Sequence, residues 1–342
     1  MTRRLVLDLR AQRPVWRVTP EVVAAVRGAV GADWDVVEIA APISSDGDGG
    51  GGSPEAVAAA RGAEIYLGFG LPPGVIDAGR ESLRWAHTCT AGVGAVLEGL
   101  RGTGIVLTNS AGIHAEPIAD WVLAAITHFA RSFDVLVRAQ AERRWAQGMF
   151  GDKSVRVREL ARLRVGVFGM GGIGSAVARR ALALGMRVAG VRRRPAAGGP
   201  PGVAWVGGPG DLGRLAAESD VLVIAAPRTS GTDGAVGRAV LERLPPGAIV
   251  INVSRGALLD SDALLELLDR QALRGAALDV FAVEPLPPEH PLWVHPRVLV
   301  SPHVSPVTDH FWEREATLIL DNLQRYLAGS PLVNVVDKDA GY

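Results

Sequence analysis

The chain has 342 residues, of which 48% are hydrophobic and 21% charged, a globular composition long enough for two domains. Its 36 basic and 36 acidic residues cancel, so the charge balance predicts no nucleic-acid or membrane partner. The single cysteine, Cys89, excludes an internal disulfide, predicts no metal site and fits a reducing compartment. No segment resembles a signal peptide or a membrane span, so we expect a cytoplasmic protein.

Short apolar runs alternate with helical patterns through the first third of the chain. A helix is expected over residues 19–30, with Thr19 as N-cap and Pro20 at the first helical position. The glycine-rich stretch DGDGGGGSPEA, residues 46–56, predicts a flexible loop. The expected strands in this part are residues 5–9, 35–40, 64–70, 83–89 and 105–110.

A long helical run, residues 116–133, follows and predicts one helix that links two strand series. The second series is expected at residues 164–169, 186–191, 220–227, 248–254, 276–281 and 298–302. Strands that are apolar on both faces and alternate with helices are typical of parallel sheets. The sequence therefore predicts an α/β fold with two doubly wound, Rossmann-like domains.

The most informative motif is a glycine loop between an expected strand and an expected helix. In VGVFGMGGIGSAVA, Gly169 makes a tight turn, Gly171 admits a pyrophosphate to the backbone, and Gly174 lets helix and strand pack closely. Free amides at the helix start face the anion. We expect the dinucleotide to contact the whole loop, which comprises Gly169, Met170, Gly171, Gly172, Ile173 and Gly174.

The second strand of this unit ends in GVRRRP, where an NAD site carries a carboxylate for the ribose hydroxyl. Arg192 stands there, 21 residues after Gly171 (192 − 171), and no acid accompanies it. Because a guanidinium binds a 2′-phosphate, the pattern predicts NADP as the preferred cofactor, with NAD possible, and assigns Arg192 and Arg193 to that phosphate. The alternative is a solvated loop whose arginines only stack on adenine.

Three polar residues follow later strands: Arg255, Glu284 and His303. Doubly wound sheets bind ligands at the carboxyl ends of their strands, so these side chains can converge beside a nicotinamide. Reduction of a 2-oxo acid needs a cation for the carboxylate and an acid for the forming alkoxide. His303 can donate that proton if Glu284 orients its ring and keeps it charged. The alternative is that the histidine is an ordinary surface residue.

The blocks GAIVINVSRGALLDSDALLELL, GAALDVFAVEPLPPEHPLW and VLVSPHVS, together with the glycine loop, resemble the D-isomer-specific 2-hydroxyacid dehydrogenases over nearly the whole chain. The resemblance implies catalytic roles for Arg255, Glu284 and His303. It also implies that the TAGVG loop, residues 90–94, grips the substrate carboxylate through Ala91 and Gly92. Further cofactor contacts are implied for Pro227, Ser254 and Asp279, the last beside the nicotinamide carboxamide.

The family layout implies a substrate domain of residues 1–112 and 305–342, a dinucleotide-binding domain of residues 113–304, and an active-site cleft between them. It also implies a homodimer through the cofactor domains, with Trp145 in the contact region. The arginine-bearing strand resembles the NADPH-using glyoxylate/hydroxypyruvate reductase branch. The expected function is therefore reduction of a small 2-oxo acid to the D-2-hydroxy acid.

Two other functions stay open from the sequence. The family includes transcriptional corepressors that sense dinucleotides, although this chain carries no extra interaction tails. A dehydrogenase of an unusual, pathway-specific 2-oxo acid is a second rival, because the sequence does not identify the substrate or the physiological direction. Cys89 precedes the substrate loop, but hydride transfer needs no nucleophile, so we interpret it as a small buried residue. His87 and His114 either tune substrate choice or are structural.

Overall fold

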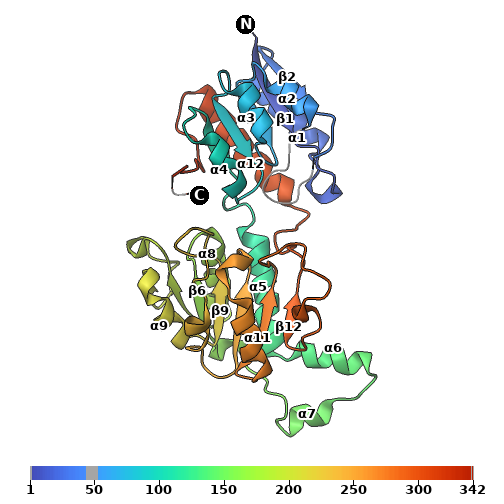
Figure 1. Cartoon of the computed structure of the whole chain (residues 1–342), viewed down its shortest axis with the longest axis vertical. Helices are drawn as coiled ribbons and strands as arrows, with labels where there is room; N and C mark the ends of the chain where they lie inside the picture. Colours follow the sequence, from blue (N-terminus) through green and yellow to red (C-terminus); the bar gives the residue numbers. More distant parts are fainter. Residues whose placement is uncertain (1, 44–52, 340, 342) are drawn as a thin grey trace. The chain divides into compact units, whose positions relative to one another are not determined.

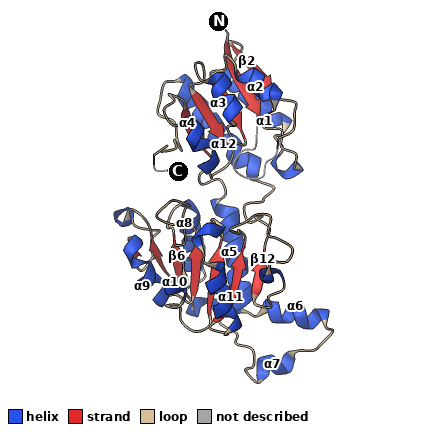
Figure 2. Ribbon diagram, in the orientation of Figure 1, coloured by secondary structure: helices blue, strands red, loops and turns tan. Residues whose placement is uncertain are grey.

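The computed structural model describes residues 2–43, 53–339 and 341. The chain forms two compact units, each built on one parallel sheet (Figures 1 and 2). Unit 1 comprises Met1–His114 and Val307–Tyr342, and unit 2 comprises Ala115–Pro306. The two doubly wound units expected from the sequence are therefore confirmed. Among the described residues, every helix is too short or too polar to span a bilayer.

The sheet of unit 1 has the order β2-β1-β3-β4-β5, and all its strands are parallel. The strands are β1 (Arg3–Asp8), β2 (Trp34–Glu38), β3 (Ile65–Gly68), β4 (Trp85–Thr88) and β5 (Val106–Asn109). The helices are α1 (Pro20–Val30), α2 (Pro54–Ala60), α3 (Pro73–Gly79), α4 (Gly94–Leu100) and α12 (Phe311–Leu327). Alternate residues of one strand enter different cores, Leu5 and Leu7 on one face and Val6 on the other, because helices cover both faces.

The structure confirms two local predictions in unit 1 only in part. Helix α1 begins at Pro20 as expected, but the Thr19 side chain makes no capping hydrogen bond. The loop predicted over residues 46–56 lies partly outside the described residues, and its last part is wrong. Ser53 accepts a hydrogen bond from Ala56 N at 3.0 Å and caps α2, which starts at Pro54. The Ser-Pro pair is therefore a helix start, since serine caps well and proline suits the first turn.

The sheet of unit 2 has the order β12-β11-β10-β9-β6-β7-β8 and is also parallel. Its strands are β6 (Arg164–Phe168), β7 (Arg187–Val191), β8 (Val206–Gly207), β9 (Val221–Ile224), β10 (Ala248–Asn252), β11 (Leu273–Leu278) and β12 (Val298–Val300). Its helices are α5 (Ala115–Ala130), α6 (Phe133–Ala141), α7 (Gln147–Gly151), α8 (Gly172–Ala183), α9 (Leu212–Ala217), α10 (Arg238–Leu241) and α11 (Ser261–Asp269). The two-residue strand β8 is too short for a sequence pattern, and it was not expected.

The single helix predicted over residues 116–133 is wrong, because α5 ends at Ala130 and α6 begins at Phe133. Ser132, between them, has φ +59°, and its hydroxyl donates to Arg156 O at 3.2 Å. The first turn of α6 carries Asp134, which forms a buried ion pair with Arg274 at 2.6 Å. An ion pair between residues 140 positions apart thus fixes the break between α5 and α6. A local hydrophobic pattern cannot predict such a pairing.

Candidate active site

The glycine loop joins β6 to α8 with the conformation that its spacing predicts. Gly169 has φ +103°, and a Cβ there would overlap the Ala226 amide. A Cβ on Gly174 would overlap the carbonyl oxygen of Gly169. Gly171 differs, because no atom lies within 4 Å of its would-be Cβ. Two glycines therefore permit close packing, and the third leaves the helix start open.

The start of α8 fits an anion. Gly171 is the N-cap residue, and among the described residues no side chain caps this helix. The first-turn amides and the helix dipole can therefore serve a phosphate. Gly172 is exposed and Ile173 partly buried, whereas the Met170 side chain is buried and packs against Gly190 beneath β7.

The end of β7 presents the three arginines. Arg192 is partly buried, its amide donates to Gly207 O at 3.0 Å, and its Nη1 donates to Gly198 O at 2.8 Å. Arg193 and Arg194 are exposed. Asp211, which follows β8, accepts a hydrogen bond from Gly208 N at 2.9 Å. Cationic donors therefore occupy the position after β7 where an NAD site carries its acid.

His303 and Glu284 form a hydrogen-bonded pair. His303 Nδ1 lies 2.8 Å from Glu284 Oε2, and Glu284 Oε1 accepts from Phe281 N at 2.9 Å. Burial alone raises the pKa of Glu284, but the bonds from His303 and Phe281 and the charges of His303 and Arg255 together lower it. An ionised Glu284 accepts the Nδ1 proton, so Nε2 of the ring is the atom available to a substrate.

Arg255 reaches this pair because of a glycine. Gly256 follows it, and a Cβ there would overlap the backbone of Phe281. The loop after β10 can therefore lie directly against the loop that leads to Glu284. Asn252 organises this loop: its Oδ1 accepts from Ser254 N and Oγ, both at 3.1 Å, and its Nδ2 donates to Arg255 O at 3.0 Å. The sequence reasoning missed Asn252, although it stands in the quoted INVSRG block.

Asp279 holds the loop that carries His303. Its carboxylate is buried and accepts from Ser301 Oγ at 2.6 Å, Val304 N at 2.9 Å and Ser305 N at 3.0 Å. His303 N donates to the Asp279 carbonyl oxygen at 2.9 Å, and His303 itself has φ +56°. Both carboxylate oxygens of Asp279 thus have partners within unit 2. Sequence reasoning did not find this bracing role, because the resemblance placed Asp279 at the nicotinamide.

The remaining site residues lie on other loops. Ala91 and Gly92 follow β4 in unit 1, where Asn109 Nδ2 donates to Ala91 O and Thr90 Oγ1 donates to Gly92 O, both at 2.9 Å. Pro227 follows β9 and is exposed, whereas Ser254 is buried beside Asn252. The trio of Arg255, Glu284 and His303 belongs to unit 2.

Cys89 is buried, as expected, and its thiol is no nucleophile. Burial raises its pKa well above the ordinary value, and the charge of Glu315 raises it further. His87 is buried between Thr108 and Glu315, and His114 stacks on Phe311 with ring centroids 5.5 Å apart. Both histidines thus have packed, structural surroundings in unit 1. The Trp145 side chain is 88% exposed.

Comparisons with known proteins identify relatives of this chain. The family model of the D-isomer specific 2-hydroxyacid dehydrogenase, NAD binding domain, matches residues 123–305. Glyoxylate/hydroxypyruvate reductase B of Pectobacterium carotovorum is 35% identical over 257 residues, 75% of this chain and 79% of that protein. Glyoxylate/hydroxypyruvate reductase A of Photorhabdus laumondii is 32% identical over 81% of this chain and 87% of its own length.

Solved structures of the same family superpose on the complete chain. A D-isomer specific 2-hydroxyacid dehydrogenase from Xanthobacter autotrophicus, in complex with NADPH, gives a TM-score of 0.78 at 29% identity and covers 100% of both chains. The NADPH-dependent glyoxylate/hydroxypyruvate reductase from Sinorhizobium meliloti, in complex with NADP, gives 0.77 at 26% identity and covers 99% of this chain and 100% of its own. The chain belongs to the D-isomer specific 2-hydroxyacid dehydrogenase family.

Proposed function

We propose that this protein reduces a small 2-oxo acid to the D-2-hydroxy acid with NADPH. The hydrogen-bonded pair of His303 and Glu284, with Arg255 on the adjoining loop, carries this proposal. An imidazole held by an ionised carboxylate beside a guanidinium is the set of groups that protonates a carbonyl oxygen and binds a carboxylate. The reductase activity in the names of the relatives supports the same reaction.

Each residue then has a distinct task. Arg255 binds the carboxylate and polarises the carbonyl of the substrate, and the amides of Ala91 and Gly92 hold the carboxylate from the other unit. When bound, the reduced nicotinamide supplies the hydride that adds to the carbonyl carbon. His303 donates the Nε2 proton to the carbonyl oxygen, so one hydride and one proton account for the hydroxy acid. Glu284 stabilises the charged ring before the transfer.

NADP is the preferred cofactor in this proposal, and NAD is a weaker alternative. Residues Gly169–Gly174 take the pyrophosphate at the start of α8, and Arg192 and Arg193 take the 2′-phosphate at the end of β7. Pro227, Ser254 and Asp279 complete the cofactor side. The complexes of two structural relatives with NADPH or NADP support this preference.

We divide the two binding functions between the two units, of which unit 1 consists of two segments of the chain. We assign residues 1–112 and 305–342 to a substrate domain and residues 113–304 to a dinucleotide-binding domain. We propose the cytoplasm as the compartment of the enzyme, because the single cysteine fits a reducing compartment.

We also propose a homodimer through the cofactor domain. Figure 1 shows α6 and α7 standing away from the sheet of unit 2. Phe133 is 46% and Val137 59% exposed, and both line an apolar groove with Leu123 and Leu184. Exposed apolar surface of this kind is typical of protein interfaces. A Val137→Asp variant should sediment as a monomer if this face carries the dimer, whereas an unchanged dimer would place the interface elsewhere.

The decisive experiment follows nicotinamide absorbance with glyoxylate, hydroxypyruvate, pyruvate and phenylpyruvate, each with NADPH and with NADH. We expect turnover with at least one acid and a higher kcat/KM with NADPH. His303→Ala should lower kcat by about a hundredfold or more, because the general acid is lost. His310→Gln, an exposed histidine outside the proposed catalytic trio, is the matched control. Tight NADPH binding without turnover of any acid would contradict the proposal and favour a sensing role.

A further inference from the structure

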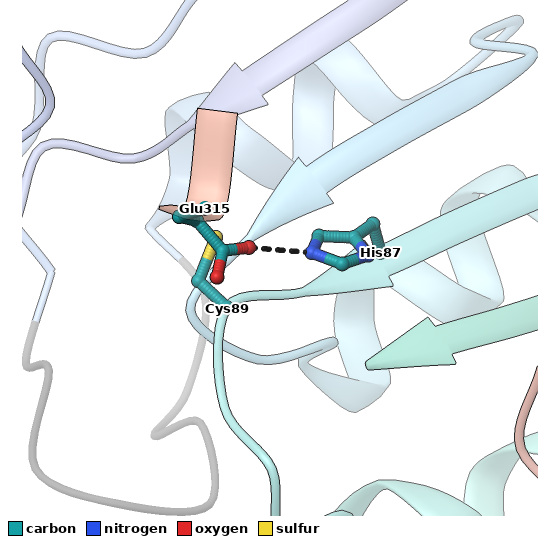
Figure 3. A group of neighbouring side chains, drawn as sticks. All are labelled: His87, Cys89 and Glu315. Carbon is teal, nitrogen blue, oxygen red and sulfur yellow. Dashed lines mark hydrogen bonds and ion pairs between the residues drawn. The ribbon is translucent and has the colours of Figure 1, made fainter. Parts of the chain in front are cut away.

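A second cluster of reactive side chains lies in unit 1, inside the fold. His87 and Cys89 come from the end of β4, and Glu315 comes from the first turns of α12 (Figure 3). All three residues are buried, with 1%, 2% and 0% exposure, and their ligand atoms lie within 4.8 Å of one another. More than 220 residues separate Cys89 from Glu315 in the chain (315 − 89 = 226), so only the fold brings the cluster together.

The buried carboxylate has an unused oxygen. Oε1 of Glu315 lies 2.7 Å from His87 Nε2 and accepts from Ser110 Oγ at 2.9 Å. Oε2 is buried and, among the described residues, lacks a hydrogen-bond partner. In Figure 3 the Cys89 sulfur lies beside this carboxylate. The Cys89 thiol beside it is only a weak donor, so the buried oxygen is poorly satisfied, which points to a missing ligand.

The surroundings of His87 resemble those of a metal-binding histidine. Its Nδ1 lies 2.8 Å from Thr108 Oγ1, which also accepts from Trp85 Nε1 at 2.9 Å. When Nδ1–H donates to Thr108, the Nε2 lone pair is free for a metal, whereas in the metal-free cluster a hydrogen lies between Nε2 and Glu315 Oε1. Such an outer partner for the second ring nitrogen is the usual companion of a histidine that binds a metal through the first.

We propose that His87 Nε2, Cys89 Sγ and Glu315 Oε2 bind a divalent thiophilic metal ion, Zn²⁺ by the chemistry of the three ligands, at a structural site. Imidazole, thiolate and carboxylate are all zinc ligands. One thiolate and one carboxylate neutralise the ion, so the loaded site has no net charge, as a buried position requires. On loading, the thiol proton leaves to solvent, and His87 changes tautomer: it loses the hydrogen that Nε2 shares with Oε1 and takes one up at Nδ1, so that Nε2 binds the metal.

The geometry requires a modest rearrangement. Tetrahedral zinc bonds of about 2.0–2.3 Å place ligand atoms roughly 3.3–3.8 Å apart. The three ligand atoms Nε2, Sγ and Oε2 must reach this spacing. Nε2 and Oε1, now 2.7 Å apart, no longer share a hydrogen and therefore separate, while the Ser110 bond to Oε1 is retained. The Ser110 hydroxyl or a water can take the fourth position. Because the cluster joins β4 to α12, the metal would tie the C-terminal helix to the N-terminal sheet.

The single cysteine makes the test unambiguous. The full chain is produced in zinc-depleted medium supplied with Co²⁺, so that the closed site fills while the protein folds. Tetrahedral cobalt bound to a thiolate gives a charge-transfer band in the near ultraviolet, and only Cys89 can supply that thiolate. We expect this band with equimolar bound cobalt, and equimolar zinc in protein from ordinary medium.

Variants decide whether the three residues bind together. Cys89→Ser should lose the band, and His87→Gln and Glu315→Gln should each weaken metal binding by more than about 100-fold, since outer-shell changes alone cost 10–100-fold. His310→Gln changes an exposed histidine of the same unit and should retain the metal. Circular dichroism and gel filtration establish that each variant is folded. Wild-type protein that is folded, lacks the band and holds no stoichiometric zinc would overturn the proposal and leave a metal-free hydrogen-bond cluster.

Discussion

The substitution Asp279→Asn tests whether this carboxylate holds the catalytic loop. The side chain keeps its size, but one of its two acceptor oxygens becomes an NH₂ donor. With Nδ2 in place of Oδ2, the Ser305 amide faces another donor, and its lost bond leaves a buried N–H unpaired at about 1–3 kcal/mol. The hydrogen bonds from Ser301 and Val304 then end on a neutral amide oxygen in place of a carboxylate. Each therefore stabilises the fold by roughly 1 kcal/mol less. The expected loss of unfolding free energy is on the order of 3 kcal/mol.

Activity should fall with stability, because the same loop positions His303. A displacement of about 1 Å at a catalytic group costs on the order of a hundredfold in rate, so we expect kcat to fall by tenfold to a hundredfold. Urea unfolding gives the stability, and NADPH oxidation with the best 2-oxo acid gives kcat. Ser301→Ala is the matched control, since it removes one of the three bonds and leaves the charge; it should cost less on both scales. Wild-type stability and kcat in Asp279→Asn would refute the bracing role.

Three further predictions concern charges of unit 2. Arg192→Asp should move the preference from NADPH toward NADH, measured as the ratio of the two kcat/KM values; an unchanged ratio would place the 2′-phosphate elsewhere. Arg255→Ala should abolish turnover while NADPH still binds by fluorescence titration, and retained turnover would exclude it as the substrate cation. Burial raises the pKa of Asp220, but Arg164 and Arg158 outweigh it and lower the pKa from 3.8 to about 2. A depressed carboxyl pKa stabilises the fold above pH 4, and this stabilisation is lost as the pH falls toward 2. Asp220→Asn should therefore cost about 2 kcal/mol at pH 6 but less than about 1 kcal/mol at pH 2.5 in urea unfolding, at 1.36 kcal/mol per pKa unit. An equal cost at both values would contradict the ion-pair explanation.

The proposed metal cluster and the proposed reductase activity can fail independently. The cluster belongs to unit 1, whereas Arg255, Glu284 and His303 belong to unit 2. Turnover without bound zinc would leave the reaction intact and remove the metal. Stoichiometric zinc without turnover would do the reverse.

Local patterns were enough for the fold class and for most of the longer strands, and they named the candidate site residues. Apolar runs such as residues 220–227 identify buried strands, because a parallel strand covered on both faces needs apolar side chains at every position. The glycine loop was predictable because its glycine spacing is a short local pattern. The structure shows why glycine is needed: Gly169 has a positive φ, and a Cβ at Gly169 or Gly174 would overlap neighbouring backbone atoms. The arginines after β7 could be named as candidates for a similar reason. The residue that contacts the adenosine ribose lies at a fixed separation from the glycine loop.

Several features that sequence reasoning missed depend on partners far apart in the chain. The break at Ser132 rests on the pairing of Asp134 with Arg274, and the brace of His303 rests on Asp279 with residues more than 20 positions away. The cluster of His87, Cys89 and Glu315 joins the two ends of the chain. Hydrophobic periodicity records which face of an element is buried, but it does not record which polar groups meet there. The sequence alone therefore determined the fold class and the separate candidate groups, and only the tertiary structure decided which of them touch, because hydrogen bonds and ion pairs form between atoms that folding brings together.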